Sequence, residues 1–179
     1  MAKRVIYYIS GNNLAYKEID YTIPADMSKS EQDALNDAML NAGLDLPQPC
    51  VNVSSKFGHG GTLSIFSVKL NESKSIRDIW NELYSCKGDQ VTPPGMYEIL
   101  YMKALTEDQA IKILNAGSFY DIYYNPDSDK GSAAKACAMF QLLCKQGNLE
   151  YITDSDKFLL WFLVNQQYAI PHESINQNK

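Results

Sequence analysis

The sequence is short of the side chains from which metal sites and histidine-based active sites are built. It contains two histidines, His59 and His172. None of its cysteines forms the C-x-x-C spacing of zinc-binding motifs. The four cysteines are Cys50, Cys86, Cys137 and Cys144. We therefore expect no metal site and no cofactor, and we interpret the cysteines as small buried hydrophobic residues in a reducing compartment. A nucleophilic pair of Cys50 or Cys86 with a histidine remains a minor alternative.

Long apolar runs are also missing. The longest extends from Phe158 to Val164, whereas a membrane-spanning helix needs about 20 apolar residues. The basic residues at the N-terminus are followed by a short apolar run and then by a turn signal, Ser10 to Asn13, which does not fit a secretory signal peptide. We expect a soluble, cytoplasmic protein that does not enter a membrane.

Positive charge is scarce and scattered. The chain has 16 lysines and arginines against 21 acidic residues, a net charge of −5, and only two of the basic residues are arginine. Binding to a phosphate backbone relies on clustered lysine and arginine, and no such cluster is present in the sequence. We therefore do not expect nucleic acid to be a direct partner.

The composition is otherwise that of an ordinary globular domain. Hydrophobic residues make up 45% and charged residues 21% of the 179 residues. This length is typical of a single domain, and we expect residues 1–179 to form one compact unit. The Pro93-Pro94 pair lies in a short stretch, 91–95, that can join two halves, 1–90 and 95–170.

The hydrophobic pattern predicts an α+β fold. It would have a mixed, largely antiparallel sheet of about six strands with four to five packed helices. The predicted strands are Lys3–Ile9, Leu14–Ile23, Val51–Phe57, Leu63–Leu70, Met96–Met102 and Phe119–Tyr124. The helices are predicted to start at Ser28, Ser75, Thr106, Ser132 and Thr153 or Asp154, residues that commonly cap helix N-termini.

Two stretches of the chain resemble each other. Lys17–Tyr21 precedes a capped helix that ends in Asn41-Ala42-Gly43, and Tyr97–Tyr101 precedes one that ends in Asn115-Ala116-Gly117. Both are predicted as β–α–β units, which leaves an internal duplication open. Chance similarity is the better interpretation, because glycine commonly ends a helix.

Two loops are candidates for ligand binding. Gly58 to Thr62 contains three glycines around His59, which allows a ligand close to the backbone, although a hairpin tip is the better explanation of the glycines. The loop before the helix at Ser132 offers free backbone amides to an anion. Its candidate ligand-binding residues are Asn125, Asp127, Ser128, Asp129, Lys130 and Ser132. It is neither a P-loop nor a calcium loop, because the motif of the first and the twelfth-position carboxylate of the second are absent.

Tyrosine is unusually frequent, with 12 residues in the chain. Strands favour aromatic residues, which accounts for part of this number. However, Tyr16 shares a predicted strand face with Glu18, and Tyr97 shares one with Glu98. Tyrosine on a polar face provides a large contact area at low entropic cost, so these four residues are our candidate interface.

The sequence contains no connected set of catalytic residues. We therefore predict a non-catalytic protein-binding module of the inhibitor, adaptor or accessory type, whose partner is another protein. The alternative is a small protein that binds an anionic ligand, or a small enzyme, with a pocket near residues 125–132 and His59.

Overall fold

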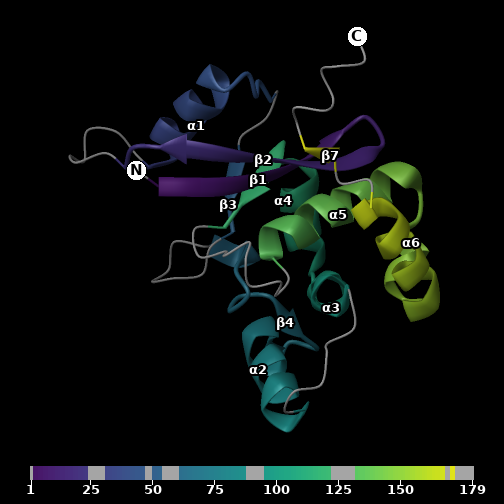
Figure 1. The fold of residues 1–179 in the computed structure, drawn as a ribbon. Helices are drawn as coiled ribbons and strands as arrows, with labels where there is room; N and C mark the ends of the chain where they lie inside the picture. The colour runs from purple at the N-terminus through teal and green to yellow at the C-terminus, as the bar shows by residue number, and fades with distance from the viewer. Residues whose placement is uncertain are drawn as a thin grey trace.

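The fold is taken from a computed structural model of the chain. It describes residues 2–23, 31–46, 50–53, 61–87, 95–121, 132–167 and 170–171. Within these ranges a mixed β-sheet carries α1 on one face and α3, α4 and α5 on the other (Figure 1). The α2 helix lies beyond α3, away from the sheet (Figure 1). The predicted α+β class is confirmed.

The centre of the sheet is an antiparallel hairpin near the N-terminus. β1 (Ala2–Ser10) and β2 (Asn13–Tyr21) pair along their whole length, with Ser10 opposite Asn13. β6 (Ser118–Tyr120) pairs antiparallel with β1, and β3 (Cys50–Asn52) pairs parallel with β6. The two-residue β7 (Ile170–Pro171) pairs parallel with β2. The strand order is β3-β6-β1-β2-β7, and a separate pair is formed by β4 (Lys69–Leu70) and β5 (Lys74–Ser75).

The two faces of β1 explain its central position. Val5 and Tyr7 point into the larger core, which they share with α3 and α5. Ile6 and Tyr8 point to the opposite face and join the smaller core under α1. Side chains alternate along a strand, so a run that is apolar at every position suits a strand covered on both faces. The prediction of a central strand from Lys3 to Ile9 is confirmed.

Most helices begin and end at the predicted signals. The described helices are α1 (Glu31–Asn41), α2 (Ile76–Lys87), α3 (Met96–Lys103), α4 (Glu107–Leu114), α5 (Ala133–Gln146) and α6 (Ser155–Gln167). The capping box of α4 is complete, because the Thr106 and Gln109 side chains each bond the other's backbone amide. Ser132 caps α5, and Gly147 ends it in the left-handed conformation.

Two predicted strands are wrong. Met96–Met102 is the helix α3, whose residues are buried almost all round. Such a helix lacks the polar face that reveals a 3.6-residue period, and its tyrosines and isoleucine mimic a strand. Of Leu63–Leu70, only Lys69–Leu70 is extended. The Val68 and Ser67 amides bond back to the Ser64 carbonyl in turns, which serine favours.

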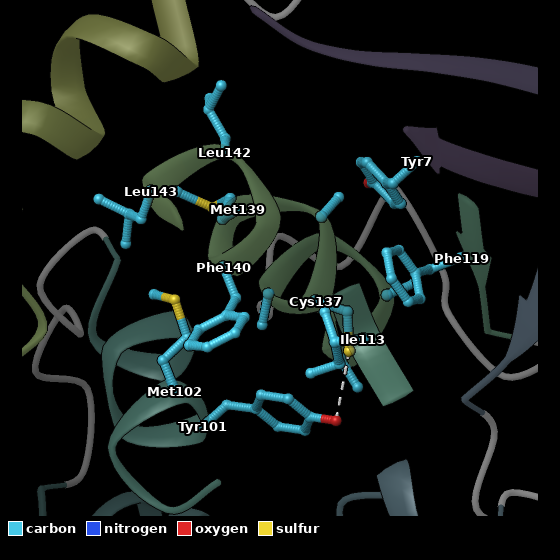
Figure 2. Packing of buried hydrophobic residues seen from close by; sticks show 14 of the residues in the cluster. Tyr7, Tyr101, Met102, Ile113, Phe119, Cys137, Met139, Phe140, Leu142 and Leu143 are labelled. Carbon is cyan, nitrogen blue, oxygen red and sulfur yellow. Dashed lines mark hydrogen bonds between the residues drawn. The ribbon is translucent and has the colours of Figure 1, made fainter. Parts of the chain in front are cut away.

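The larger core is dominated by α5. Ala136, Cys137 and Leu142 of α5 are fully buried, with the side chains of α3 on one side and those of the sheet on the other. Figure 2 shows Tyr101 of α3 pointing toward Cys137 of α5, with Tyr7 and Phe119 of the sheet nearby. The Tyr101 hydroxyl donates to the Leu63 carbonyl at 2.5 Å and lies 3.4 Å from the Cys137 sulfur. Because α5 carries several small residues, α3 and the sheet can both approach it closely.

No helix in the described part of the chain has the length and apolar character needed to cross a membrane.

Candidate functional site

The predicted ligand loop is described only at its downstream end. Asn125, Asp127, Ser128, Asp129 and Lys130 lie outside the described residues, as does His59 of the glycine-rich segment. Ser132 is described and is 2% exposed. Its hydroxyl accepts a hydrogen bond from the backbone amide of Lys135 at 3.4 Å, so it acts as the N-cap of α5.

The four candidate interface residues lie in two different environments. Tyr16 is partly buried on β2, with its ring 6.2 Å from that of Tyr7. Glu18 is at the surface and pairs with Lys3 at 2.7 Å. Tyr97 and Glu98 lie in α3 and are buried, so the prediction that they share an exposed strand face is wrong. Consecutive residues of a strand would also point to opposite faces.

Glu98 is the most unusual of these residues. It is only 3% exposed, and its carboxylate lies 3.9 Å from the ammonium group of Lys135, whose side chain is 17% exposed. Glu98 sits in the first turn of α3, where the helix dipole favours a carboxylate. Lys135 comes from the first turn of α5. The packing of α3 against α5 therefore places opposite charges together inside the protein.

Asp121 brings a second carboxylate to this region. It directly follows β6. Burial raises the pKa of Tyr97 well above the usual phenol value, and the negative charges of Asp121 and Glu98 add to the rise. Burial also raises the pKa of Cys137 to about 12, and Asp121 again contributes. Asp121 is thus electrostatically coupled to residues of both α3 and α5.

Aromatic rings lie next to two residues of this region, Tyr97 and Lys135. The ring of Trp80 meets Tyr97 edge-on, with centroids 5.2 Å apart. The ammonium group of Lys135 lies 5.1 Å from the centre of the Phe162 ring, in cation–π geometry. We call Glu98, Asp121 and Lys135 the charged cluster. Its three members come from α3, the end of β6, and α5.

The charged cluster contains groups that can bind a polar ligand. A buried carboxylate such as Glu98, paired with the partly buried ammonium group of Lys135, interacts strongly with polar ligands. Burying charge also costs stability, so folds retain it most often where it has a use. Asp121 and Lys135 flank residues 122–131, which include the predicted ligand loop. The sequence shows Glu98 inside an otherwise apolar segment, but it predicts a place on the polar face of a strand rather than in a buried helix.

A second feature is an apolar surface on α6. Leu160 is 67% exposed and Val164 54%, and Leu159 and Leu163 are partly exposed beside them. A shallow groove of about 320 Å³ runs along this helix, with Tyr151 and Trp161 among its lining residues. This α6 face is apolar and exposed, which is typical of surfaces that contact other proteins.

The comparisons with known proteins give a match over part of the chain. No curated protein matches the chain. A family profile described as DarT1-associated NADAR antitoxin matches residues 83–172, which is half of the chain. The matched segment includes the charged cluster and α6, but neither β1 nor β2. The chain therefore belongs to the family of DarT1-associated NADAR antitoxins.

Proposed function

We propose that this protein neutralises a toxin of the DarT1 type, and that it does so through the charged cluster. The family match supports the role of antitoxin. It agrees with the inhibitor-type role predicted from the sequence, because an antitoxin counteracts a toxin. The toxin as partner is inferred from the family description.

An antitoxin can act on the toxin itself or on what the toxin has produced. The observation that favours the second mode is the buried pair of Glu98 and Lys135 with Asp121 nearby. A surface that only binds a protein has no need of a buried glutamate paired with a lysine from another helix. Such charges suit a ligand-binding or catalytic site, the alternative that the sequence placed near residues 125–132.

A growth assay tests the role of the charged cluster. Cells that express a DarT1 toxin would be complemented with the wild-type chain, Glu98→Gln or Lys135→Met. We expect wild type to restore growth and both variants to fail while remaining folded. Lys145→Met is the matched control, because it removes a lysine from the other end of the same helix, where Lys145 bonds the Gly11 carbonyl. Full protection by both cluster variants would contradict the proposal.

The order of expression separates the two modes. Toxin synthesis is induced and then stopped, the remaining toxin is degraded through an inducible tag, and the antitoxin is induced only afterwards. Recovery under these conditions means that the protein acts on the toxin's product. Protection only when the two proteins are present together means that it acts on the toxin.

Direct binding to the toxin is the second candidate, and the exposed apolar face of α6 favours it. It corresponds to the protein-binding module predicted from the sequence. The double variant Leu160→Asp with Leu163→Asp places charge on this face without entering the core. If binding is the mechanism, this variant loses toxin capture in a pull-down and protection in cells, whereas Lys135→Met keeps both.

A further inference from the structure

We infer that Phe162 is a positioning residue, which holds the Lys135 ammonium group against Glu98, and that Gly95 is glycine so that Phe162 can reach this position. The inference rests on the proposed function of the charged cluster. It assigns a role to α6 that is separate from its exposed face.

The first step is the contact between Phe162 and Lys135. Phe162 is 2% exposed and lies on the buried side of α6, opposite Leu160 and Val164. The Lys135 ammonium group is 5.1 Å from its ring centre and 3.9 Å from the Glu98 carboxylate. A lysine side chain has four rotatable bonds and many conformations. The contacts with the ring and with the carboxylate together select a narrow set of them.

The second step is the separation between lysine and glutamate. At 3.9 Å the pair is longer than a direct charge-assisted hydrogen bond, which is about 2.8 Å. Glu98 by itself would draw the ammonium group closer. Attraction to the face of Phe162 competes with this pull on the ammonium group. The ammonium group therefore stays within reach of Glu98 without closing a tight salt bridge.

The third step is the close approach of Phe162 to the start of α3. Gly95 is the N-cap residue of α3 and has a φ of 76°, in the left-handed region. A Cβ atom at this position would lie 2.9 Å from Cγ of Phe162 and 3.2 Å from Cε1 of Phe158. Any other residue would push the rings of α6 away. Glu98 follows Gly95 by only three residues. Moving the Phe162 ring away from Gly95 would therefore also move it away from the charged cluster.

An NMR experiment on the full chain tests the placement directly. The Lys135 ammonium group lies 5.1 Å from the centre of the Phe162 ring, so the ring current should shift the neighbouring ε-methylene protons upfield. We expect Phe162→Leu to abolish this upfield shift. Phe158→Leu removes a buried ring from the same helix, and should keep most of it. An unchanged Lys135 shift in a folded Phe162→Leu variant would overturn the inference.

Protection against the toxin provides the functional readout. We expect Phe162→Leu to lower survival about tenfold, and Phe162→Tyr to restore it, because the aromatic face is what the ammonium group contacts. Progressively fluorinated phenylalanines at position 162 keep the size of the ring and weaken its negative face. Protection should fall stepwise as fluorine atoms are added, while the melting temperature stays constant. A loss of packing alone would lower the melting temperature as well. Equal protection across this series would also overturn the inference.

These outcomes are distinguishable from a failure of the proposed function. If Lys135→Met protects fully, the charged cluster is not the working site and the proposed function fails. If Lys135→Met loses protection while folded Phe162→Leu keeps it, the proposed function stands and the positioning role of Phe162 is wrong.

Discussion

At the scale of single residues, a comparison of Gly95 with Gly43 distinguishes the energetic cost of backbone strain from the cost of steric crowding. Both have a positive φ, 76° and 75°. A Cβ at Gly95 would clash with Phe162, whereas nothing lies within 4 Å of a Cβ at Gly43. We expect Gly43→Ala to lower the free energy of unfolding by about 1 kcal/mol, from left-handed strain alone. Gly95→Ala should cost about 3 kcal/mol, because overpacking is added to the same strain.

Urea denaturation of both variants gives these two values. Because both positions carry the same backbone strain, the difference between the variants measures the crowding against α6. Equal destabilisation would mean that Phe162 moves aside without penalty.

The buried Cys137 thiol should make the stability of the protein fall at alkaline pH. Burial raises its pKa to about 12 in the folded state, whereas an unfolded thiol titrates near 8.5. Below about pH 8.5 both states hold the proton, so the contribution of this thiol to stability is fully present. As the pH rises, the unfolded thiol ionises first. This contribution then falls by on the order of 1 kcal/mol per pH unit until the folded pKa is reached.

The measurement compares wild type with Cys137→Ala between pH 8 and 10.5. The stability difference between the two proteins at pH 8 should shrink as the pH rises, because the alanine variant lacks this titration. The buried tyrosines titrate in both proteins and cancel to first order. Parallel stability curves would show that the Cys137 thiol is accessible to base.

Single residues also show the limit of the sequence interpretation. Ser132 was recognised as a helix cap because capping is local and has its own chemistry. Glu98 was recognised as a candidate contact residue, but it was placed at the surface. Its burial depends on Lys135, 37 positions further along the chain, and no local pattern reports such a pairing.

At the scale of elements, α4 shows how a cap connects a helix to its surroundings. The Gln109 side chain accepts from the Thr106 amide at 2.9 Å and donates to the Thr62 carbonyl at 2.6 Å. Thr106→Ala removes the capping hydroxyl and should cost about 1 kcal/mol. Gln109→Ala should cost about twice as much, because it also leaves the Thr62 carbonyl without its side-chain donor.

Thermal unfolding of both variants tests this order, and Thr106→Ser serves as a control that retains a capping hydroxyl. A larger effect for Thr106→Ala than for Gln109→Ala would mean that the link to Thr62 contributes nothing.

Elements with an amphipathic pattern could be predicted, and elements without one could not. The β1–β2 hairpin and the capped helices α4 and α5 follow from turn residues, caps and periodicity. The sequence does not reveal α3, because burial on nearly all sides removes the periodic signal and its packing against α5 is not visible in the local sequence. The apparent β–α–β repeat fails for the same reason, since Tyr97–Tyr101 belongs to a helix. The two-halves organisation remains a prediction.

At the scale of the whole molecule, the segment that identifies the family is not a self-sufficient fold. The family match covers residues 83–172, yet β6 within it is paired on both sides by strands from outside it, β1 and β3. Tyr7 and Val5 of β1 also cover the core that α5 and Phe119 build. A fragment comprising residues 83–179 would expose this sheet-facing side of α5 and both edges of β6.

We therefore expect the 83–179 fragment to lack a cooperative unfolding transition and to bind a hydrophobic dye, whereas the full chain should unfold in one step. A peptide comprising residues 1–23 supplies both β1 and β2, and adding it should restore helical circular dichroism and part of the transition. A scrambled peptide of the same composition is the matched control.

If the fragment alone unfolds cooperatively and protects cells from the toxin, the hairpin is dispensable. The charged cluster would then be organised by α3 and α5 without the sheet. We expect the opposite, because Asp121 is positioned by the end of β6, which β1 holds in register at Ile6, Tyr7 and Tyr8.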